Sequence, residues 1–365
     1  MSKKIIFSAG GTGGHIFPAM NLMKHFSEKG YDVILVTDKR GNAFISNYSK
    51  FRSYILTSGT PTNKNFLNKV LSFFIIFYSL LKAAIILKKE KADLAIGFGG
   101  YVSFPISFAS RFFNLPLLIY ENNSVLGKAN KFLLPFAKKI LLSNIIKKNF
   151  PEKYKNKIHE VGPILNKNIF NNLKIEKNYD KDNFSLLILG GSQGAEIFGK
   201  IIPPVVKMVK NEGYNIEVMQ QCIQSQKDSV IDYYKKNNIK NYVFEFDVNV
   251  LKLILSSDLA ITRCGASTTA ELAHTTTPFI AVPLPNSIDN HQYLNAKFYE
   301  DRGCCWILEQ HNFNSKNLFN LIMELVKNKN KLKILHENMK KINQNNVYSD
   351  IENQIKEIIQ KWKLI

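Results

Sequence analysis

Cysteine is scarce in this chain of 365 residues, which contains only Cys222, Cys264, Cys304 and Cys305. The four form no CxxC pair and no cluster with histidine at the spacing of a zinc site. A disulfide-stapled scaffold and a zinc-finger architecture are therefore excluded. This use of cysteine is typical of proteins in a reducing compartment.

Long hydrophobic runs are also missing. The first apolar run, Ile5–Phe7, soon gives way to Gly10 and Gly11 and is too short for the core of a signal peptide. The most apolar stretch, Val70–Leu81, falls short of the roughly 20 residues that cross a bilayer. We therefore expect a cytoplasmic protein without a spanning segment.

Acidic residues are few, with 29 against 49 basic ones and a net charge of +20. Such a balance favours acidic partners, namely nucleic acid, phosphorylated substrates or anionic lipid. The lysines are scattered, however, in a chain rich in Lys, Asn and Ile, so base composition explains the charge equally well. Charge alone selects no partner.

The chain does contain short apolar runs that alternate with helix-like segments such as Pro18–Lys29, which predicts parallel, doubly wound sheets. Its length and its hydrophobic content of 45% suit two domains. The predicted strands of the first half are Ile5–Ser8, Val33–Thr37, Leu94–Gly97, Leu117–Tyr120 and Lys139–Ser143. Those of the second half are Ser185–Leu189, Ile216–Gln220, Tyr242–Phe244, Leu259–Thr262 and Phe279–Val282. A polar linker is predicted over Asn166–Asn183, and a helical tail over Asn314–Ile365.

Three glycine-rich turns follow predicted strands: Ala9–His15, Gly97–Tyr101 and Gly190–Ala195. Glycine lets backbone N–H groups approach a phosphate closely, and a following helix N-terminus favours negative charge. Each turn alone is also an ordinary strand–helix connection. Three at the carboxyl ends of strands, where open α/β sheets bind ligands, predict a phosphate-bearing substrate.

A nicotinamide dehydrogenase is the obvious competitor, because Asp38 follows the second strand. Its glycine fingerprint fails here, since the third glycine position is occupied by Ile16. Neither later turn completes the fingerprint.

The segment Arg263-Cys-Gly-Ala-Ser-Thr-Thr-Ala-Glu271 reads as a polar turn and a helix start. Its free backbone donors suit a diphosphate, and Glu271 suits a ribose. Thr268 and Glu271 also have the spacing of a capping box, which does not exclude ligand binding. Downstream, Pro283–Ala296 is dense in amides that suit sugar hydroxyls, although it also fits an ordinary polar surface.

These motifs together resemble the MurG family, the transferases of peptidoglycan synthesis that add N-acetylglucosamine to lipid I. The matching segments run in family order over nearly the whole chain. They are Gly10–Pro18, Gly97–Ser103, Glu121–Asn123, Gly190–Ala195, Arg263–Ala266 with Glu271, and Asp289–Ala296.

The resemblance implies a GT-B fold, an α/β architecture of two Rossmann-like domains whose parallel sheets face each other across a cleft. We expect an N-terminal acceptor and membrane-docking domain over 1–165, a nucleotide-sugar domain over 166–340, and a helix over 341–365 that returns to the first domain. It also implies an inverting transfer with no bound metal and no cofactor. The implied partners are UDP-N-acetylglucosamine, undecaprenyl-linked lipid I and an anionic membrane surface, with no nucleic acid.

Residue roles carry over only where the motifs match. The resemblance implies that Glu271 holds the ribose and that the turn at Ala266 faces the diphosphate. His15 is the first candidate for the general base that an inverting transfer needs, and Glu121 the second; either side chain is also open to a structural reading. The candidate substrate-binding residues are Thr12, Gly13, Gly14, Asn123, Lys167, Ser192, Gln193, Arg263, Ala266, Ser267, Glu271, Gln292 and Asn295.

One departure concerns the end of the first domain, where the family usually has Gly-Asn-Pro-x-Arg. Here the sequence runs from Val161 to Lys167 without that Asn and Arg, so Lys167 is the candidate replacement.

The apolar stretch Val70–Leu81 has lysines on both sides, at Lys69 and Lys82. A buried core helix is one interpretation. The other is an interfacial patch that docks the enzyme on the cytoplasmic face of the inner membrane, where a lipid-linked acceptor lies.

Three other functions fit parts of the sequence. They are a diglyceride glycosyltransferase, a UDP-sugar 2-epimerase, and a membrane adaptor that keeps the fold without turnover.

Overall fold

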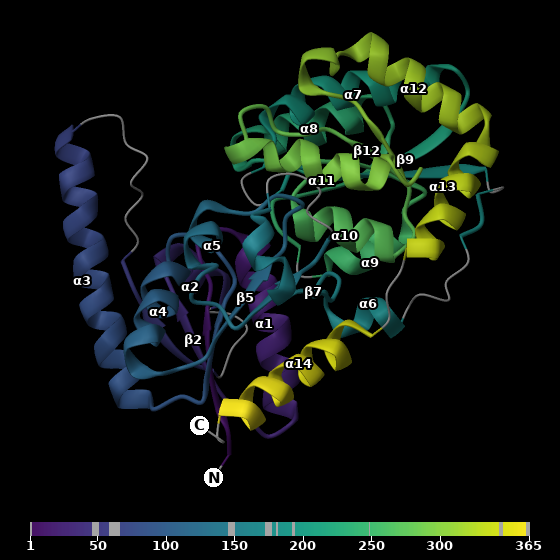
Figure 1. Ribbon diagram of the computed structural model, residues 1–365. Coiled ribbons are helices and arrows are strands. Elements are labelled where there is room, and N and C mark those ends of the chain that lie inside the picture. Colours follow the sequence, from purple (N-terminus) through teal and green to yellow (C-terminus); the bar gives the residue numbers. More distant parts are fainter. Residues whose placement is uncertain are drawn as a thin grey trace. The chain divides into compact units, whose positions relative to one another are not determined.

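A computed structural model of the chain describes residues 2–45, 51–57, 66–144, 150–171, 177–179, 182–191, 194–247, 249–342 and 346–362. The chain forms two compact units. The first comprises Met1–Leu165 together with Gln344–Ile365, and the second comprises Asn166–Asn343. Each unit has its own parallel sheet flanked by helices (Figure 1).

The first unit contains a seven-stranded parallel sheet in the order β3-β2-β1-β4-β5-β6-β7. Its strands are β1 (Lys4–Ser8), β2 (Asp32–Thr37), β3 (Arg52–Ile55), β4 (Leu94–Gly97), β5 (Leu117–Glu121), β6 (Lys139–Leu142) and β7 (Ile158–Glu160). The strand order reverses between β1 and β4. In open α/β sheets, ligands bind outside the carboxyl ends of the strands at such a reversal.

Two long helices and several short ones accompany this sheet. They are α1 (Gly13–Glu28), α2 (Lys39–Ile45), α3 (Phe66–Glu90), α4 (Ser103–Ala109), η1 (Ser110–Phe113), α5 (Lys128–Leu133) and η2 (Glu152–Lys157). The helix α14 (Val347–Trp362) joins them from the far end of the sequence. Its Glu352 carboxylate lies 2.5 Å from Nε2 of His25, and its Tyr348 hydroxyl donates to the Leu165 carbonyl at 2.6 Å.

The second unit repeats the design with a six-stranded parallel sheet in the order β10-β9-β8-β11-β12-β13. Its strands are β8 (Asn183–Leu189), β9 (Asn215–Gln221), β10 (Lys240–Phe244), β11 (Leu259–Thr262), β12 (Phe279–Ala281) and β13 (Cys305–Ile307). Its helices are α6 (Lys167–Asn171), α7 (Glu196–Asn211), α8 (Gln224–Lys236), α9 (Val250–Ser256), α10 (Ala266–His274), η3 (Ile288–Asn290), α11 (His291–Glu300), η4 (Gln310–Asn312), α12 (Ser315–Lys327) and α13 (Lys329–Ile342). Here the order reverses between β8 and β11.

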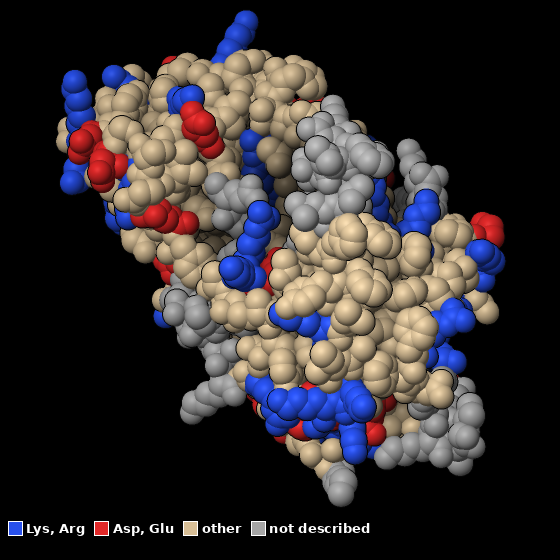
Figure 2. All heavy atoms as spheres, turned by 90° about the vertical axis from the view of Figure 1, so that its left-hand side faces the viewer, with Lys and Arg blue, Asp and Glu red and all other residues tan. Residues whose placement is uncertain are grey.

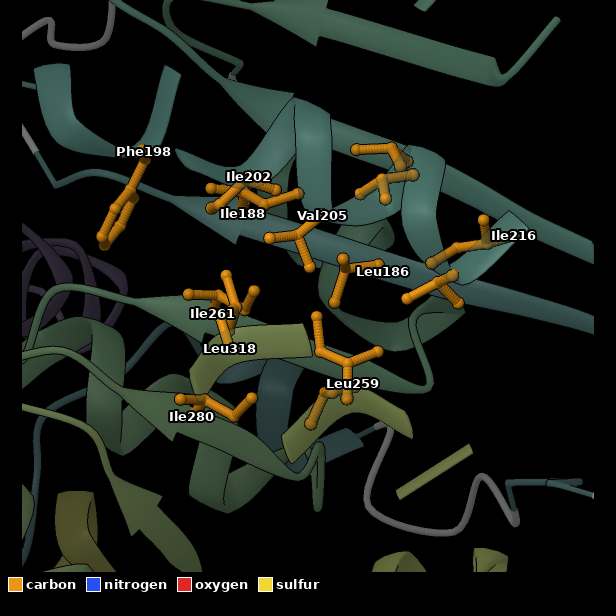
Figure 3. Packing of buried hydrophobic residues seen from close by; sticks show 14 of the residues in the cluster. Leu186, Ile188, Phe198, Ile202, Val205, Ile216, Leu259, Ile261, Ile280 and Leu318 are labelled. Atoms are coloured by element: carbon orange, nitrogen blue, oxygen red, sulfur yellow. The ribbon is translucent and has the colours of Figure 1, made fainter. Parts of the chain in front are cut away.

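Strand β8 shows why the apolar runs of the sequence become strands. Leu186 and Ile188 belong to one core cluster, with Val205 of α7 (Figure 3). The alternate residues Leu187 and Leu189 belong to a second cluster, with Leu272 of α10. Both faces of the strand are therefore buried, and a strand buried on both faces must be apolar throughout.

All ten strands predicted from the sequence are present, with bounds that shift by at most a few residues. The strands that the sequence analysis missed are β3, β7 and β13. The first two are edge strands whose residues are mostly exposed or half-buried, and neither carries an apolar run. Strand β13 is apolar but has only three residues. The predicted linker contains α6.

Candidate functional site

In the first unit, two of the predicted glycine-rich turns lie next to each other. They follow β1 and β4, which pair directly with Ser8 opposite Gly97. Gly99 and Gly100 have φ angles of +85° and +77°, and a Cβ atom on either would lie 3.4 Å from the ring of His15. Glycine at these two positions allows the turn after β4 to close against the histidine.

His15 is half-buried in the first turn of α1. Its Nδ1 atom lies 3.3 Å from the carbonyl oxygen of Gly10. A carbonyl only accepts hydrogen bonds, so Nδ1 carries the proton and donates it. In the neutral ring Nε2 is then the basic nitrogen, which is the tautomer that a general base at this position requires.

The second candidate base, Glu121, is bound to groups of the loop after β5. Its carboxylate accepts hydrogen bonds from the backbone N–H of Asn123 (3.0 Å) and of Gly127 (3.0 Å). It also accepts from the side-chain amides of Asn123 (3.1 Å) and Asn130 (2.9 Å). Both oxygens are thereby engaged in holding the loop after β5. These bonds favour a structural role for Glu121, and its role as a base stays a prediction.

Asn122, which the sequence analysis left without a role, connects this loop to the histidine. Its amide donates to the carbonyl of Gly14 in the first turn of α1 at 3.0 Å, and its oxygen accepts from the hydroxyl of Tyr120 at 3.2 Å. The sequence did contain a signal for this role, because two adjacent amides, Asn122 and Asn123, directly follow the buried strand β5. In the same turn, Gly13 is buried, and the N-cap residue Thr12 is exposed.

In the second unit, the turn after β11 lies beside the turn after β8. The Arg263 N–H donates to the carbonyl of Leu189 at 3.0 Å, and Gly190 and Gly191 follow directly. Ser192 and Gln193, two predicted contacts in this turn, lie outside the described residues.

Helix α10 begins at Ala266, which is buried, and continues with Ser267, which is half-buried. Its N-cap is Gly265, which has no side chain to accept from the first-turn N–H groups. The helix therefore presents backbone donors and the positive end of its dipole at the strand-order reversal, an arrangement suited to an anion. The predicted capping box is wrong, because the helix starts before Thr268.

Glu271 lies on α10 one turn beyond that N-terminus and is half-buried. Its carboxyl group forms no hydrogen bond or ion pair with any of the described side chains or backbone groups. Burial raises the pKa of Glu271 from its ordinary value to about 7. A ligand that donates hydrogen bonds to this carboxyl group would stabilise its ionised form.

Gln292 and Asn295, both on α11, fasten the turn between β11 and α10. The side-chain oxygen of Gln292 accepts from the N–H groups of Cys264 and Leu284, each at 3.0 Å. The Asn295 amide donates to the carbonyl of Cys264 at 3.1 Å. Asn295 is buried, which favours a supporting role, and its contact with substrate stays a prediction. Gln292 is half-buried and also has an NH2 group.

Arg263 also supports the loops around this turn, and its contact with substrate stays a prediction. One terminal nitrogen donates to the carbonyls of Val282 and Pro283 at 3.1 Å each, and the other donates to Gln310 at 2.5 Å. The guanidinium lies 5.1 Å from the ring centroid of Phe198. Only 7% of the residue is exposed.

Lys167 begins α6. This helix meets α10 through Phe170 and His274, whose ring centroids are 5.9 Å apart, at the end of α10 away from Ala266. Within the described residues, no group of three or more His, Cys, Asp or Glu side chains is placed to hold a metal ion.

One face of α3 is apolar and exposed. Phe73, Phe77, Leu81 and Ile85 follow one another at four-residue spacing, with exposed fractions between 50% and 67%. The buried residues of the helix lie on its other faces and are Ser72, Ser79, Ala83, Ile86 and Leu87. The exposed stripe is the opposite of what a buried core helix would show, so that interpretation of the stretch is wrong. The described side chains begin at Ser72, so Lys69, Val70 and Leu71 lie outside this description.

Aromatic side chains of η1 and α5 add to this apolar face. Phe112 and Phe132 are 72% and 57% exposed, and both pack against Phe108. Basic groups lie among them, because Lys82 sits over the ring of Tyr78 and Arg111 over the ring of Phe136. Figure 2 shows a broad area of the first unit without acidic or basic side chains, with basic ones at its border. We call this area, formed by α3, η1 and α5, the aromatic face. No helix in the described part of the chain has the length and apolar content to cross a membrane.

Comparison with known proteins gives matches along nearly the whole chain. Residues 5–142 match the N-terminal domain of glycosyltransferase family 28, and residues 185–355 match its C-terminal domain. A protein of Pelagibacter ubique named UDP-N-acetylglucosamine–N-acetylmuramyl-(pentapeptide) pyrophosphoryl-undecaprenol N-acetylglucosamine transferase is 39% identical over 361 residues, covering 98% of this chain and 99% of its own.

Two further relatives extend the comparison. A protein of the same name from Rickettsia canadensis is 39% identical, covering 89% of this chain and 91% of its own. The crystal structure of Acinetobacter baumannii MurG superposes with a TM-score of 0.77 at 26% identity, covering 97% of this chain and 99% of that one.

Proposed function

Because the chain belongs to glycosyltransferase family 28, we propose that it transfers N-acetylglucosamine from UDP-N-acetylglucosamine to lipid I, forming lipid II for peptidoglycan. The observation that carries this proposal is the match, over 98% of the chain, to a transferase named for that donor and acceptor. The two strand-order reversals supply a candidate site in each unit. In this proposal the site in the second unit binds the donor, and the site in the first unit supplies the general base.

The second unit is the donor domain in this proposal. The N-terminus of α10 faces the diphosphate, whose charge its backbone N–H groups and dipole stabilise as UDP departs. Glu271, one turn along, accepts hydrogen bonds from the ribose hydroxyls, which supply a partner that the described residues do not offer its carboxyl group. Gln292 and Asn295 hold the turn in place, and the NH2 group of Gln292 is a further candidate contact to the donor.

The first unit supplies the base. Nε2 of His15 accepts the proton of the acceptor hydroxyl, while that oxygen bonds to the anomeric carbon and the bond from this carbon to the diphosphate breaks. The anomeric centre inverts in one such displacement. The Nδ1 hydrogen bond to Gly10 supports this role, because it makes Nε2 the basic nitrogen of the neutral ring.

The aromatic face is the membrane-docking surface in this proposal. A lipid-linked acceptor does not leave the bilayer, so the enzyme must reach it at the cytoplasmic face. Exposed phenylalanines contribute affinity by entering the interface, at up to about 1.5–3 kcal/mol for each side chain that becomes fully buried. Lys82, Lys88 and Arg111 add an attraction to anionic lipid that salt weakens.

The test is a transfer assay with purified protein, labelled UDP-N-acetylglucosamine and a short-chain lipid I analogue, without added metal. We expect a labelled lipid II analogue. Transfer to diglyceride and not to the lipid I analogue would identify a diglyceride glycosyltransferase. Conversion of the donor without any acceptor would identify an epimerase. Donor binding without turnover on any acceptor would leave only an adaptor.

A further inference from the structure

We propose that the Asp38 carboxylate positions His15 and strengthens it as a base through a single peptide group, the one between Gly10 and Gly11. This proposal rests on the proposed role of His15. It gives a function to an acidic residue that the sequence analysis considered only as the mark of a dehydrogenase.

The relay consists of two hydrogen bonds at opposite ends of one peptide group. The N–H of Gly11 donates to Oδ1 of Asp38 at 3.2 Å. The carbonyl of Gly10 accepts from Nδ1 of His15 at 3.3 Å. The carbonyl of Gly10 and the N–H of Gly11 belong to the same planar, trans peptide, so they point in opposite directions. The carboxylate therefore faces the donor end and the imidazole faces the acceptor end.

The electrostatic consequence has a definite sign. A negative charge at the N–H polarises the peptide and makes its carbonyl a stronger acceptor, because hydrogen bonds in a chain strengthen one another. The stronger acceptor stabilises the proton on Nδ1 and the imidazolium that forms when Nε2 takes up the acceptor proton. A histidine held in this way is a stronger base than one bound to an unpolarised carbonyl.

The structure fixes Asp38 for this task. The residue is 7% exposed and directly follows β2, and the same oxygen accepts from the N–H of Gly41 at 2.7 Å. A Cβ atom at residue 10 would lie 3.1 Å from that oxygen and 3.0 Å from Val102, so glycine there permits the approach.

The charged residues next to Asp38 are exposed, and Glu121 is bound to another side chain. Lys39 and Arg40 follow Asp38 in the chain and are exposed, so solvent screens them. Glu121 is bound to Asn130, whose amide nitrogen would lie 3.3 Å from a Cβ at Gly99. Asp38 is therefore the charge that the loop brings to the histidine through a direct hydrogen-bonded path.

The decisive variant is Asp38→Asn, which removes the charge and keeps an oxygen that can accept from Gly11. We expect kcat to fall about 10-fold, within the range typical of residues that orient a functional group through hydrogen bonds without contacting the substrate. The acid limb of the kcat/KM profile should move to lower pH, because a less stabilised imidazolium forms at lower pH. The affinity for UDP should stay unchanged, since the proposed donor site lies in the other unit.

Two comparisons separate this role from a structural one. Asp93→Asn is the matched control, because Asp93 also binds a backbone N–H, that of Lys4 at 2.8 Å, at the other end of β1. It should leave the pH profile unmoved. In the His15→Ala background, Asp38→Asn should cause no further loss, because a residue that acts through the histidine has nothing left to act on.

The outcomes distinguish the two proposals. If His15→Ala retains most activity, the base assignment fails. If His15→Ala is inactive but Asp38→Asn keeps its normal rate and acid limb, the relay alone is refuted. A loss that adds to that of His15→Ala also refutes the relay.

A second measurement does not depend on activity. Nitrogen NMR of histidine-labelled protein, with the His15 signal assigned by its absence in His15→Ala, should show a lower imidazole pKa in Asp38→Asn. An unchanged pKa would overturn the proposal. If Asp38→Asn does not fold, Asp38→Ser supplies an uncharged hydroxyl acceptor for the same measurement.

Discussion

Replacing Glu271 by glutamine should weaken donor binding and, at neutral to alkaline pH, stabilise the protein. The substitution keeps the shape of the side chain and removes its charge. Burial raises the pKa of Glu271 from 4.5 to about 7, and each tenfold change in proton affinity is worth about 1.36 kcal/mol. Since the side chain is half-buried, we expect the ionised carboxylate to cost the folded state about 2–3 kcal/mol.

The sign of the pH dependence follows from the raised pKa. The folded protein binds this proton more tightly than the unfolded chain does, so the associated stability is full below about pH 4.5. It is lost as the pH rises through about 7. Glutamine stays neutral throughout. The variant should therefore match the parent at about pH 4.5 and exceed it by about 2–3 kcal/mol at about pH 8.

Urea unfolding at these two pH values measures the difference, and Glu212→Gln, an exposed change just beyond α7, is the control. Calorimetry with UDP measures the donor affinity of the variant, which is the second part of the prediction. We expect a loss of about 10–100-fold in affinity, the equivalent of the roughly 1.5–3 kcal/mol of a hydrogen bond to a charged group. UDP should also bind the parent more tightly as the pH rises, and the variant should lack this trend.

A variant that binds UDP with parental affinity would refute the ribose assignment. A variant destabilised equally at both pH values would refute the reasoning about the buried charge. The two halves are independent, so each result is informative by itself.

The remaining predictions concern the base, the aromatic face and the scaffold. His15→Ala should lower kcat by about 10²-fold or more at unchanged UDP affinity, and a normal kcat across pH would make the residue structural. Phe73→Ser with Phe77→Ser should reduce binding to anionic vesicles and activity on long-chain acceptor, while melting temperature and activity on a short-chain acceptor persist; unchanged vesicle binding would place the docking surface elsewhere. Arg263→Lys should lower stability by about 1–3 kcal/mol in thermal unfolding, because a lysine cannot span both carbonyls and Gln310; an unchanged melting temperature with weaker UDP binding would restore Arg263 as a ligand.

The sequence predicts the fold well, because most of the predicted strands are buried on both faces and are therefore largely apolar. The two sites, each at a glycine-rich turn that follows a strand, stay predictions. The contacts of individual side chains are harder to predict. Arg263 and Asn295 look like ligands in the sequence, since polar residues in a turn are typical of binding. In the structure both side chains donate to backbone carbonyls, and Arg263 also donates to the Gln310 side chain. Such partners come from tertiary contacts that no local pattern contains. The capping box failed for a related reason, because Gly265 starts α10 earlier than the Thr268 pattern indicates.

The helix α14 has a consequence for synthesis. It completes the first unit but follows the second unit in the chain, so the first unit is assembled from two separated stretches of sequence. A ribosome that makes the chain from its N-terminus releases every residue of the second unit before it releases α14. The second unit therefore has all of its residues first, while His25 and Lys139 still lack the partners Glu352, Gln354 and Glu357 that α14 brings. Domains generally fold as they emerge, and here the order of completion is the reverse of the order in which the two units begin.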